Sequence, residues 1–383
     1  MTPLSISDFT PYTPEMLSML RRFAAIESPS TDKAAVDRLG QAVAAELQSL
    51  GAQLTIHPQA SAGDHIEASW NFWVSGDAPQ DFSPLLLLCH MDTVFDAGTL
   101  ERFPLSEENG LLRGPGVYDM KGGIVATLFA VRLLRERGLL RRPLTALFTS
   151  DEETGSATSR PLIETLARPA AAAFCLEPAM DDGSLKTARK GTGEIEIVAR
   201  GRAAHAGTDH ARGRNAIEEL AHHVLAVQRL TDYDLGTTTN VGQVSGGTRP
   251  NVVPDEARAR VDFRIANPAD VARLEDWAAT RRPVIDGCSV EVRLAVNRPP
   301  MPRDAVMAAA YGKARAIGRG LGLDLGEGST GGGSDANFVA PLGVPVLDGL
   351  GVRGSGAHSE RERVLIDSLP ERAALLARLI LEW

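Results

Sequence analysis

The sequence predicts an α/β protein: a mostly parallel sheet with helices on both faces, and a smaller inserted α+β domain. Three observations support this prediction. Continuous apolar runs alternate with helical segments in the first 190 residues, as expected for strands that are buried on both faces. From residue 191 the strands alternate between polar and apolar residues, which is typical of a sheet with one face in water. After residue 299 the first pattern returns.

The first part of the chain alternates helix and strand. Apolar residues at helical spacing predict helices over Pro14–Ala25 and Lys33–Leu50, and Gly51 is a plausible stop for the second helix. Continuous apolar runs predict three buried strands: Pro84–Cys89, Leu144–Thr149 and Ala171–Leu176.

The middle of the chain has the order β-α-β-β-α-β, which predicts a ferredoxin-like unit. Its expected elements are Glu194–Arg200, Asn215–Leu230, Thr238–Val244, Arg258–Ile265, Ala269–Arg281 and Ser289–Val296. The pair Pro299–Pro300 resembles a linker that closes it. After it we expect a helix over Ala305–Arg319, a strand over Val344–Leu347 and a helix over Pro370–Glu382. We therefore predict one discontinuous domain, residues 1–190 and 299–383, with residues 191–298 inserted into it.

Composition narrows the class of protein. The 383 residues are 43% hydrophobic and 23% charged, and the net charge of −9 argues against a nucleic-acid or anionic-membrane partner. Cys89, Cys175 and Cys288 show no CxxC spacing, so we expect buried free thiols. The N-terminus lacks a secretory pattern, and the apolar stretch Gly122–Leu134 is too short to span a bilayer. A cytoplasmic protein is expected.

Five possible metal ligands occupy ordered contexts, several of them at strand ends. They are His90, Asp119, Glu153, Glu177 and His358. Sites in open α/β sheets gather at the carboxyl ends of the strands, so we expect the strand-end residues to converge. Carboxylates and imidazoles are the ligands that a pair of Zn²⁺-like ions takes. Since Glu152 stands beside a ligand and is free to act as a base, the pattern predicts a hydrolase.

The roles within this set follow from spacing and charge. Asp119 could bridge two cations ~3.5 Å apart, or it could cap the helix that follows it. Asp92 lies two residues after His90 and points the same way, so it could accept the second N–H of that imidazole. Glu152 and Glu153 repel one another unless a cation or a proton relieves the charge. This acidic pair could otherwise belong to a solvated loop.

Eight motifs now point to a family. They are HMDTV (90–94), GPGVYDMKGG (114–123), DEETGS (151–156), LEP (176–178), AAHAG (203–207), GGTRPNVVP (246–254), GGGSDA (331–336) and GAHSERE (356–362). In order and spacing the whole chain resembles the zinc-dependent aminoacylase and glutamate carboxypeptidase family of metallopeptidases. That family includes acetylornithine deacetylase, succinyl-diaminopimelate desuccinylase and bacterial tripeptidases.

The resemblance implies a role for each matching position. His90 and Glu177 would bind one zinc, Glu153 and His358 the other, with Asp119 bridging them, Asp92 orienting His90, and Glu152 as general base. The inserted domain would mediate dimerisation, and its His205 would reach the partner subunit's site and stabilise an oxyanion. The implied substrate contacts are Asn251, Arg264 (gripping a carboxylate), Lys190, Gly332 and Ser334. Without the resemblance, His205 reads as a strand end, Arg264 as a solvated side chain and Asn251 as a turn residue.

The implied activity is metal-dependent hydrolysis of the amide bond of a peptide or N-acyl amino acid that bears a free carboxylate, as in glutamate carboxypeptidases. The alternative is an N-acyl amino acid deacylase of the acetylornithine deacetylase type. Two divalent ions are expected as cofactors; the resemblance implies zinc, while the ligand types by themselves also fit cobalt or manganese. The expected partners are a small-molecule or short-peptide substrate and a second copy of the chain. A non-catalytic, metal-dependent binding protein would be recognised by loss of Glu152 or of a ligand, and the chain retains them all.

Overall fold

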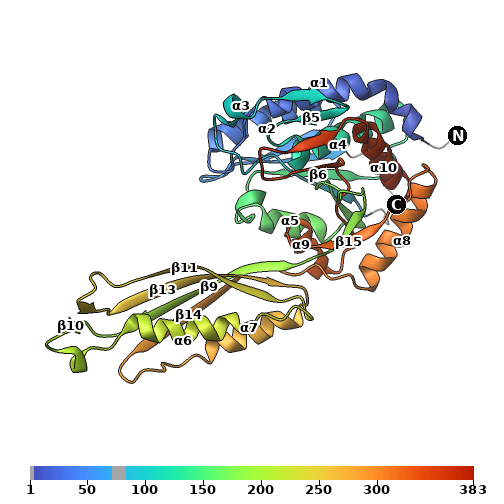
Figure 1. Cartoon of the computed structure of the whole chain (residues 1–383). Helices are drawn as coiled ribbons and strands as arrows, with labels where there is room; N and C mark the ends of the chain where they lie inside the picture. Colours follow the sequence, from blue (N-terminus) through green and yellow to red (C-terminus); the bar gives the residue numbers. More distant parts are fainter. Residues whose placement is uncertain (1–3, 71–82) are drawn as a thin grey trace. The chain divides into compact units, whose positions relative to one another are not determined.

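The chain folds around two main sheets, one in each of two units (Figure 1). The structure is a computed structural model that describes residues 4–70 and 83–383. The larger unit consists of Met1–Ala188, Arg303–Ser329 and Ser334–Trp383. The smaller unit consists of Arg189–Pro302 and Thr330–Gly333, so part of the glycine-rich loop is grouped with the inserted segment.

A six-stranded sheet forms the centre of the larger unit. Its order is β1 (Gln53–His57), β2 (His65–Trp70), β6 (Leu144–Thr149), β3 (Leu85–His90), β7 (Ala172–Cys175) and β16 (Val346–Leu347). Strands β6, β3, β7 and β16 are parallel to one another, whereas β2 pairs antiparallel with both of its neighbours, β1 and β6. The mostly parallel sheet is thus confirmed, and β3 is buried at every residue, as its unbroken apolar run predicts.

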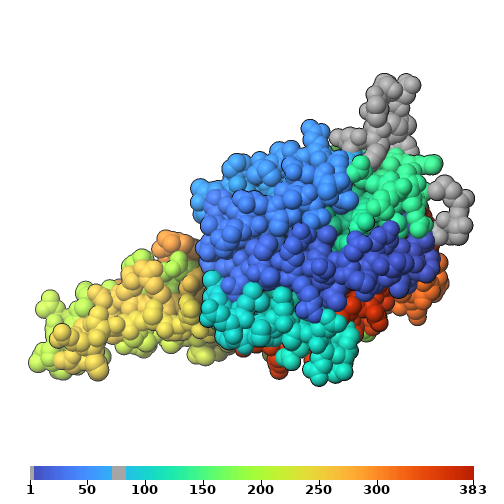
Figure 2. All heavy atoms as spheres, turned by 90° about the horizontal axis from the view of Figure 1, so that it is seen from above, coloured from blue at the N-terminus to red at the C-terminus, as the bar shows by residue number. Residues whose placement is uncertain are grey.

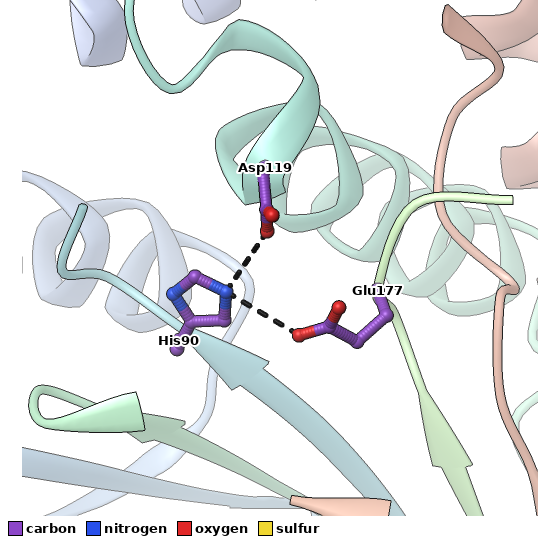
Figure 3. A group of neighbouring side chains, drawn as sticks. All are labelled: His90, Asp119 and Glu177. Carbon is purple, nitrogen blue, oxygen red and sulfur yellow. Dashed lines mark hydrogen bonds and ion pairs between the residues drawn. The ribbon is translucent and has the colours of Figure 1, made fainter. Parts of the chain in front are cut away.

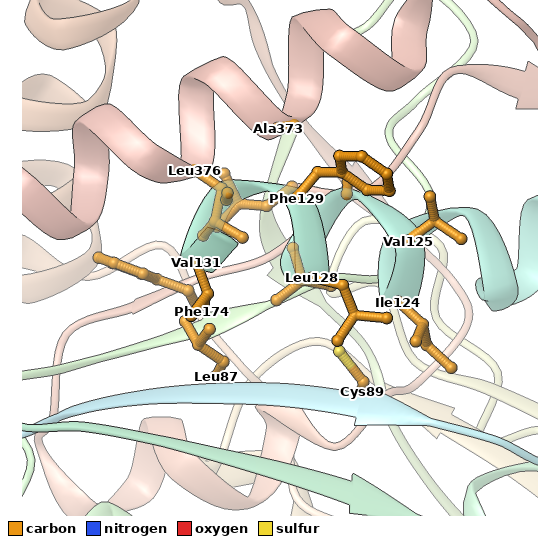
Figure 4. Close-up of a cluster of buried hydrophobic side chains, with 14 of the residues drawn as sticks. Leu87, Cys89, Ile124, Val125, Leu128, Phe129, Val131, Phe174, Ala373 and Leu376 are labelled. Carbon is orange, nitrogen blue, oxygen red and sulfur yellow. The ribbon is translucent and has the colours of Figure 1, made fainter. Parts of the chain in front are cut away.

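Helix α4 (Gly122–Glu136) lies between this sheet and α10 (Ser368–Glu382), as Figure 4 shows. Leu128 of α4 faces Cys89 of β3, and Phe129 faces the side on which Ala373 of α10 lies. A helix covered on both sides must be apolar all round, and twelve residues of α4 are buried. Burying each large apolar side chain stabilises the fold by ~1.5–3 kcal/mol, so α4 is a major source of stability beside the site.

Further helices cover both faces of the sheet (Figure 1). On the side of α4 lie α1 (Thr13–Ala24) and α2 (Lys33–Ser49), and on the other side α5 (Arg160–Ala167) and α9 (Ala336–Val339). The chain also contains α3 (Thr99–Arg102), α8 (Ala305–Arg319) and the pair β8 (Leu185–Arg189) and β15 (Glu327–Thr330). The helix covering expected from the sequence is therefore confirmed.

A second, small sheet in the larger unit did not follow from the sequence. Its order is β17 (Gly354–Ser355), β18 (Arg363–Leu365), β5 (Leu111–Arg113) and β4 (Ser106–Glu108). Strands of two or three residues leave no periodic pattern to detect. Arg21 of α1 forms an ion pair with Glu107 of β4, and Figure 2 shows these blue and teal segments side by side on one face. The sheet matters because its β17–β18 loop contains His358.

The smaller unit contains an antiparallel sheet in the order β11 (Thr238–Gly246), β13 (Glu256–Ile265), β9 (Gly191–Arg200), β14 (Ser289–Arg298). Helices α6 (Ala216–Gln228) and α7 (Ala269–Ala279) share an apolar core with this sheet. Burial along β13 alternates almost strictly, which gives the sheet one apolar and one solvated face. Two short strands, β10 (Ala204–His205) and β12 (Val252–Val253), add a ribbon to the expected order.

The burial of the cysteines and the length of the helices can be compared with what the sequence led us to expect. All three thiols are free, and Cys89 and Cys175 are buried. Cys288 is only partly buried, so the expectation of a third buried thiol is wrong. Within the described part of the chain, no helix combines the length and apolar character needed to cross a bilayer.

Gly123, in the first turn of α4, packs directly on the main chain after β7. A Cβ atom there would lie 2.2 Å from the carbonyl oxygen of Leu176, the residue before Glu177. We expect Gly123→Ala to lower the free energy of unfolding by about 1–3 kcal/mol through this overlap. Gly312→Ala in α8, where a Cβ meets no atom within 4 Å, should instead raise it by about 0.5–1 kcal/mol. Urea unfolding measures both, and equal effects would contradict the close contact.

Candidate metal centre

Three neighbouring parallel strands deliver polar residues to one edge of the large sheet. His90 is the last residue of β3, Glu152 and Glu153 lie three and four residues after β6, and Glu177 lies two residues after β7. The strand order β6-β3-β7 makes these ends adjacent, as the carboxyl edge of an open α/β sheet requires. Asp119 comes from the irregular turn before α4.

The first group of side chains joins His90, Asp119 and Glu177 (Figure 3). His90 Nε2 lies 3.1 Å from Asp119 Oδ1 and 3.4 Å from Glu177 Oε1. The imidazole is buried, and both carboxylates are largely buried. One nitrogen and two oxygens therefore converge on a single point at the strand edge.

The second group joins Asp119, Glu153 and His358. His358 Nε2 lies 3.3 Å from Asp119 Oδ2 and 3.2 Å from Glu153 Oε2. Asp119 thus directs one carboxylate oxygen to each group. In both groups the possible ligand atoms all lie within 4.8 Å of one another. All five predicted ligand residues are consequently assembled into two adjoining sets with one shared member.

The charges of the carboxylates govern the protonation of both histidines. Burial alone lowers the pKa of His90, but hydrogen bonds to Asp119, Asp92 and Glu177 together raise it well above its usual value. Hydrogen bonds to Asp119 and then Glu153 raise the pKa of His358 to about 11. Burial by itself raises the pKa of Asp119, and the two histidines overcome this effect and lower it. The carboxylates therefore create a field that attracts positive charge.

A divalent cation fits this donor set. Burial and, after it, the charge of Asp119 raise the pKa of Glu153, while the hydrogen bond from His358 opposes them. Among the described residues, Glu153 Oε1 is buried without a hydrogen-bond partner. A buried carboxylate oxygen without a partner is costly, and a cation would satisfy it and relieve the repulsion between the acids.

Asp92 connects His90 to the loop that bears the two glutamates. His90 Nδ1 lies 2.9 Å from the main-chain oxygen of Asp92 and 3.5 Å from its Oδ1. Donating from Nδ1 leaves Nε2 as the ligand atom. The Asp92 carboxylate also accepts the N–H groups of Glu153 (3.1 Å) and Glu152 (3.3 Å) and the hydroxyl of Ser30 (2.7 Å). The orientation of His90 thus comes chiefly from a main-chain oxygen, a contact that the sequence did not reveal.

His205 and Asn251 lie side by side in the smaller unit. Strands β10 and β12 pair His205 with Val252, and the N–H of Ala206 donates to the carbonyl of Asn251 (3.0 Å). His205 Nδ1 accepts the N–H groups of the residues at 207 and 208, at 3.0 and 3.1 Å. A neutral ring bound in this way carries its proton on Nε2, so the exposed edge of His205 is a hydrogen-bond donor.

Arg264 and Lys190 lie at one end of the four-stranded sheet of the smaller unit. Arg264 of β13 pairs with Thr192 of β9, and β9 begins directly after Lys190. Strand β13 begins at Glu256, beside the end of β11. From there to Arg264 it runs ~26 Å, at about 3.3 Å per residue. At the Glu256 end, the N–H of Gly201, which follows β9, donates to the carbonyl of Asp255, which precedes β13. The β10–β12 ribbon, which contains His205 and directly follows Asn251, lies at this end (Figure 1). The substrate-binding candidates of the smaller unit therefore fall into two separate groups.

The glycine-rich loop has two different environments. Gly332 is exposed, and its carbonyl accepts a bond from Arg189 Nη1 at 3.1 Å. Ser334 is fully buried, and its hydroxyl donates to Asp348 Oδ2 at 2.6 Å. That hydroxyl is therefore committed to an internal bond, which argues against the substrate contact expected of it.

Asp335, a residue that the sequence did not single out, supports the loop after β6. Its carboxylate accepts the hydroxyls of Ser156 (2.5 Å) and Thr149 (3.1 Å), which flank Glu152 and Glu153. These contacts join residues 179 and 186 positions apart. In the sequence, the one hint of this role was the position of this acidic residue directly after the GGGS run.

A parallel α/β sheet whose strand ends assemble two carboxylate–imidazole groups around a shared aspartate defines the class: a metal-dependent hydrolase. The family model described as peptidase family M20/M25/M40 matches residues 86–382, and the chain belongs to this family. The resemblance noted from the motifs is thereby confirmed.

Individual relatives agree with this assignment. The chain is 32% identical to carboxypeptidase G2 of Pseudomonas sp. (strain RS-16) over 379 residues, which cover 96% of this chain and 89% of that protein. It is 26% identical to succinyl-diaminopimelate desuccinylase of Psychrobacter arcticus over 343 residues, covering 83% and 82%. The crystal structure of aminopeptidase PepT from Bacillus cereus matches with a TM-score of 0.76 at 22% identity, covering 97% and 98%. The last match supports the fold.

Proposed function

We propose that the protein hydrolyses the amide bond of a peptide or N-acyl amino acid that bears a free carboxylate, in the manner of a glutamate carboxypeptidase. The observation that carries the proposal is the position of Asp119, whose two oxygens belong to two different ligand groups. His90 and Glu177 would hold one divalent ion, and Glu153 and His358 the other, with zinc as the preferred metal. The 32% identity to carboxypeptidase G2 supports this choice of substrate class.

The side chains of the protein would divide the chemistry among them. When bound, the cations supply Lewis acidity toward the attacking water and the amide carbonyl. Glu152 takes a proton from that water and returns it to the leaving amine. It suits this task because it is largely buried and belongs to neither ligand group. The Nε2–H of His205 donates to the oxyanion of the tetrahedral intermediate.

A homodimer would explain why the smaller unit divides its substrate candidates. Arg264 lies near one end of β13, ~26 Å along the strand from Glu256, and the ribbon that contains His205 lies at the Glu256 end. The two groups are too far apart for both to contact one small substrate within one subunit. We therefore assign Arg264 to its own subunit's substrate, and His205 with Asn251 to the partner subunit's substrate.

The smaller unit also offers a surface for dimerisation. Within the described residues, β11 is an edge strand that pairs only with β13. On and beside it Val244, Ile217 and Leu225 are 60%, 43% and 59% exposed. An exposed apolar edge strand is a template for pairing with another chain. We propose that two copies of this chain associate through β11 and α6.

The carboxylate of the substrate would bind to Arg264. Its guanidinium forms two 3.0 Å hydrogen bonds with the carboxylate of Asp262. Both side chains are substantially exposed, so this pair contributes only ~0.2–1 kcal/mol. A substrate carboxylate can take over the planar, two-pronged interaction at small cost.

A second candidate is an N-acyl amino acid deacylase. The relative named succinyl-diaminopimelate desuccinylase favours it. Both candidates use the same metal centre and release an amino acid; they differ in whether the preferred substrate is an acyl- or peptidyl-glutamate or an N-acetyl amino acid such as N-acetylornithine.

The experiment that tests the proposal is a hydrolysis panel on metal-free and metal-loaded protein. We expect release of amine from acyl- and peptidyl-glutamates with Zn²⁺, and a loss of at least ~100-fold after chelation that added metal reverses. Replacing the substrate's free carboxylate by an amide should lower kcat/KM by roughly tenfold or more. A preference for N-acetylornithine would favour the deacylase. Protein that holds two metal equivalents yet hydrolyses no amide of the panel would indicate a binding protein.

A further inference from the structure

The loop of His358 ends in a buried acid that contacts the main chain of Asp119. Glu362 is fully buried, and its Oε1 accepts the N–H groups of Tyr118 (2.8 Å) and Asp119 (3.0 Å). Its main-chain oxygen accepts the N–H of Gly114 at 3.2 Å. One residue therefore binds both ends of the segment 114–119, which places the shared carboxylate.

We propose that Glu362 is a positioning residue for the metal centre: it fixes Asp119 relative to His358 so that the two ligand groups share one carboxylate. This inference rests on the metal-dependent function proposed above. It concerns a residue outside both ligand groups.

Hydrogen bonds within the loop link the position of Glu362 to that of His358. Residues 355 and 363 pair across β17 and β18 and close the loop. Inside it, the carbonyl of Gly356 accepts both the N–H (3.2 Å) and the hydroxyl (2.8 Å) of Ser359, whose carbonyl accepts the N–H of Glu362 (3.0 Å). His358 sits within this bonded turn, with φ of 62°. A shift of Glu362 would therefore move two ligands that stand 3.3 Å apart.

Burial of a carboxylate without full solvation is costly, which argues for a purpose beyond packing. Two main-chain N–H groups compensate on one oxygen. Within the described residues, Glu362 Oε2 is buried and has no hydrogen-bond partner. An apolar side chain would fill the space at a lower cost, but it would release the turn of Asp119.

The loop provides a matched control. Glu360 lies two residues before Glu362, is about half exposed and pairs with Arg102 at 2.6 Å. We would compare Glu362→Ala, Glu362→Gln and Glu360→Gln for Co²⁺ affinity by chelator competition, for the visible absorption spectrum of bound Co²⁺, and for kcat and KM.

We expect Glu362→Ala to weaken Co²⁺ binding by 10- to 100-fold, the effect typical of lost outer-shell partners, and to change the Co²⁺ spectrum. Glu362→Gln should stay within roughly threefold of wild type, because its amide oxygen still accepts the two N–H groups. Glu360→Gln should match wild type in every measurement. The loss in Glu362→Ala should fall on kcat more than on KM.

Wild-type affinity and spectrum in Glu362→Ala would overturn the proposal, as would a Glu362→Gln variant as weak as the alanine variant. If thermal melting shows that Glu362→Ala does not fold, Glu362→Gln decides: a native Co²⁺ spectrum supports the proposal and an altered one overturns it. Wild-type protein that binds Co²⁺ but hydrolyses no amide would overturn the proposed function alone. Wild-type protein that binds no Co²⁺ would overturn both.

Discussion

Glu152→Gln should lower kcat by about 10³-fold or more, since general acid–base groups contribute 10²–10⁴-fold and Glu152 would serve both proton transfers. The glutamine keeps the size and buried position of the side chain but cannot accept the proton of the attacking water. Metal content should stay at two equivalents, because Glu152 belongs to neither ligand group. Steady-state kinetics together with metal analysis of the purified variant measure both quantities.

The neighbouring residue supplies the control. Glu153→Gln should lose metal as well as activity, because its carboxylate lies in the second ligand group, 3.2 Å from His358. Glu164→Gln, on the exposed surface of α5 where Glu164 pairs with Arg160, should retain full activity. A Glu152→Gln variant with nearly wild-type kcat would show that another group removes the proton.

The strand ends were the part of the site that sequence reasoning could locate. An unbroken apolar run has a local signature, so the ends of β3, β6 and β7 were predicted to within a residue or two. The polar residues at or shortly after the end of each run were then the candidates, and this brought in His90, Glu153 and Glu177. Sheet geometry converts that list into a cluster, because parallel neighbours end at one edge.

The supporting contacts had no such local signature. Glu362 and Asp119 are 243 positions apart in the sequence, and Asp335 and Ser156 are 179 apart. A pattern read along the chain cannot show which buried acid meets which N–H group. The same limit explains Ser334: the family resemblance implied a substrate contact, whereas in the folded chain Ser334 is buried and donates to Asp348, 14 positions away.

After the loss of the general base Glu152, we expect the largest loss of activity from substitution of His205, which would act in the partner subunit's site. His205→Ala should lower kcat/KM by about 10²–10³-fold, the effect of removing one oxyanion donor. Metal binding should be unchanged, because His205 lies in the smaller unit and outside both ligand groups. Kinetics of the variant and chelator competition check these two expectations.

Co-expression of the Glu152→Gln and His205→Ala chains then decides whether His205 acts in its own subunit or in the partner's. If it acts in the partner's, a mixed dimer contains one site with both lesions and one site with none. Random pairing makes half of the dimers mixed, so about a quarter of wild-type activity should return. If His205 served its own subunit, every site would keep one lesion and the mixture would stay inactive. Because Arg264 and His205 lie at opposite ends of the smaller unit's four-stranded sheet, which runs ~26 Å from Glu256 to Arg264 along β13, we expect the activity to return.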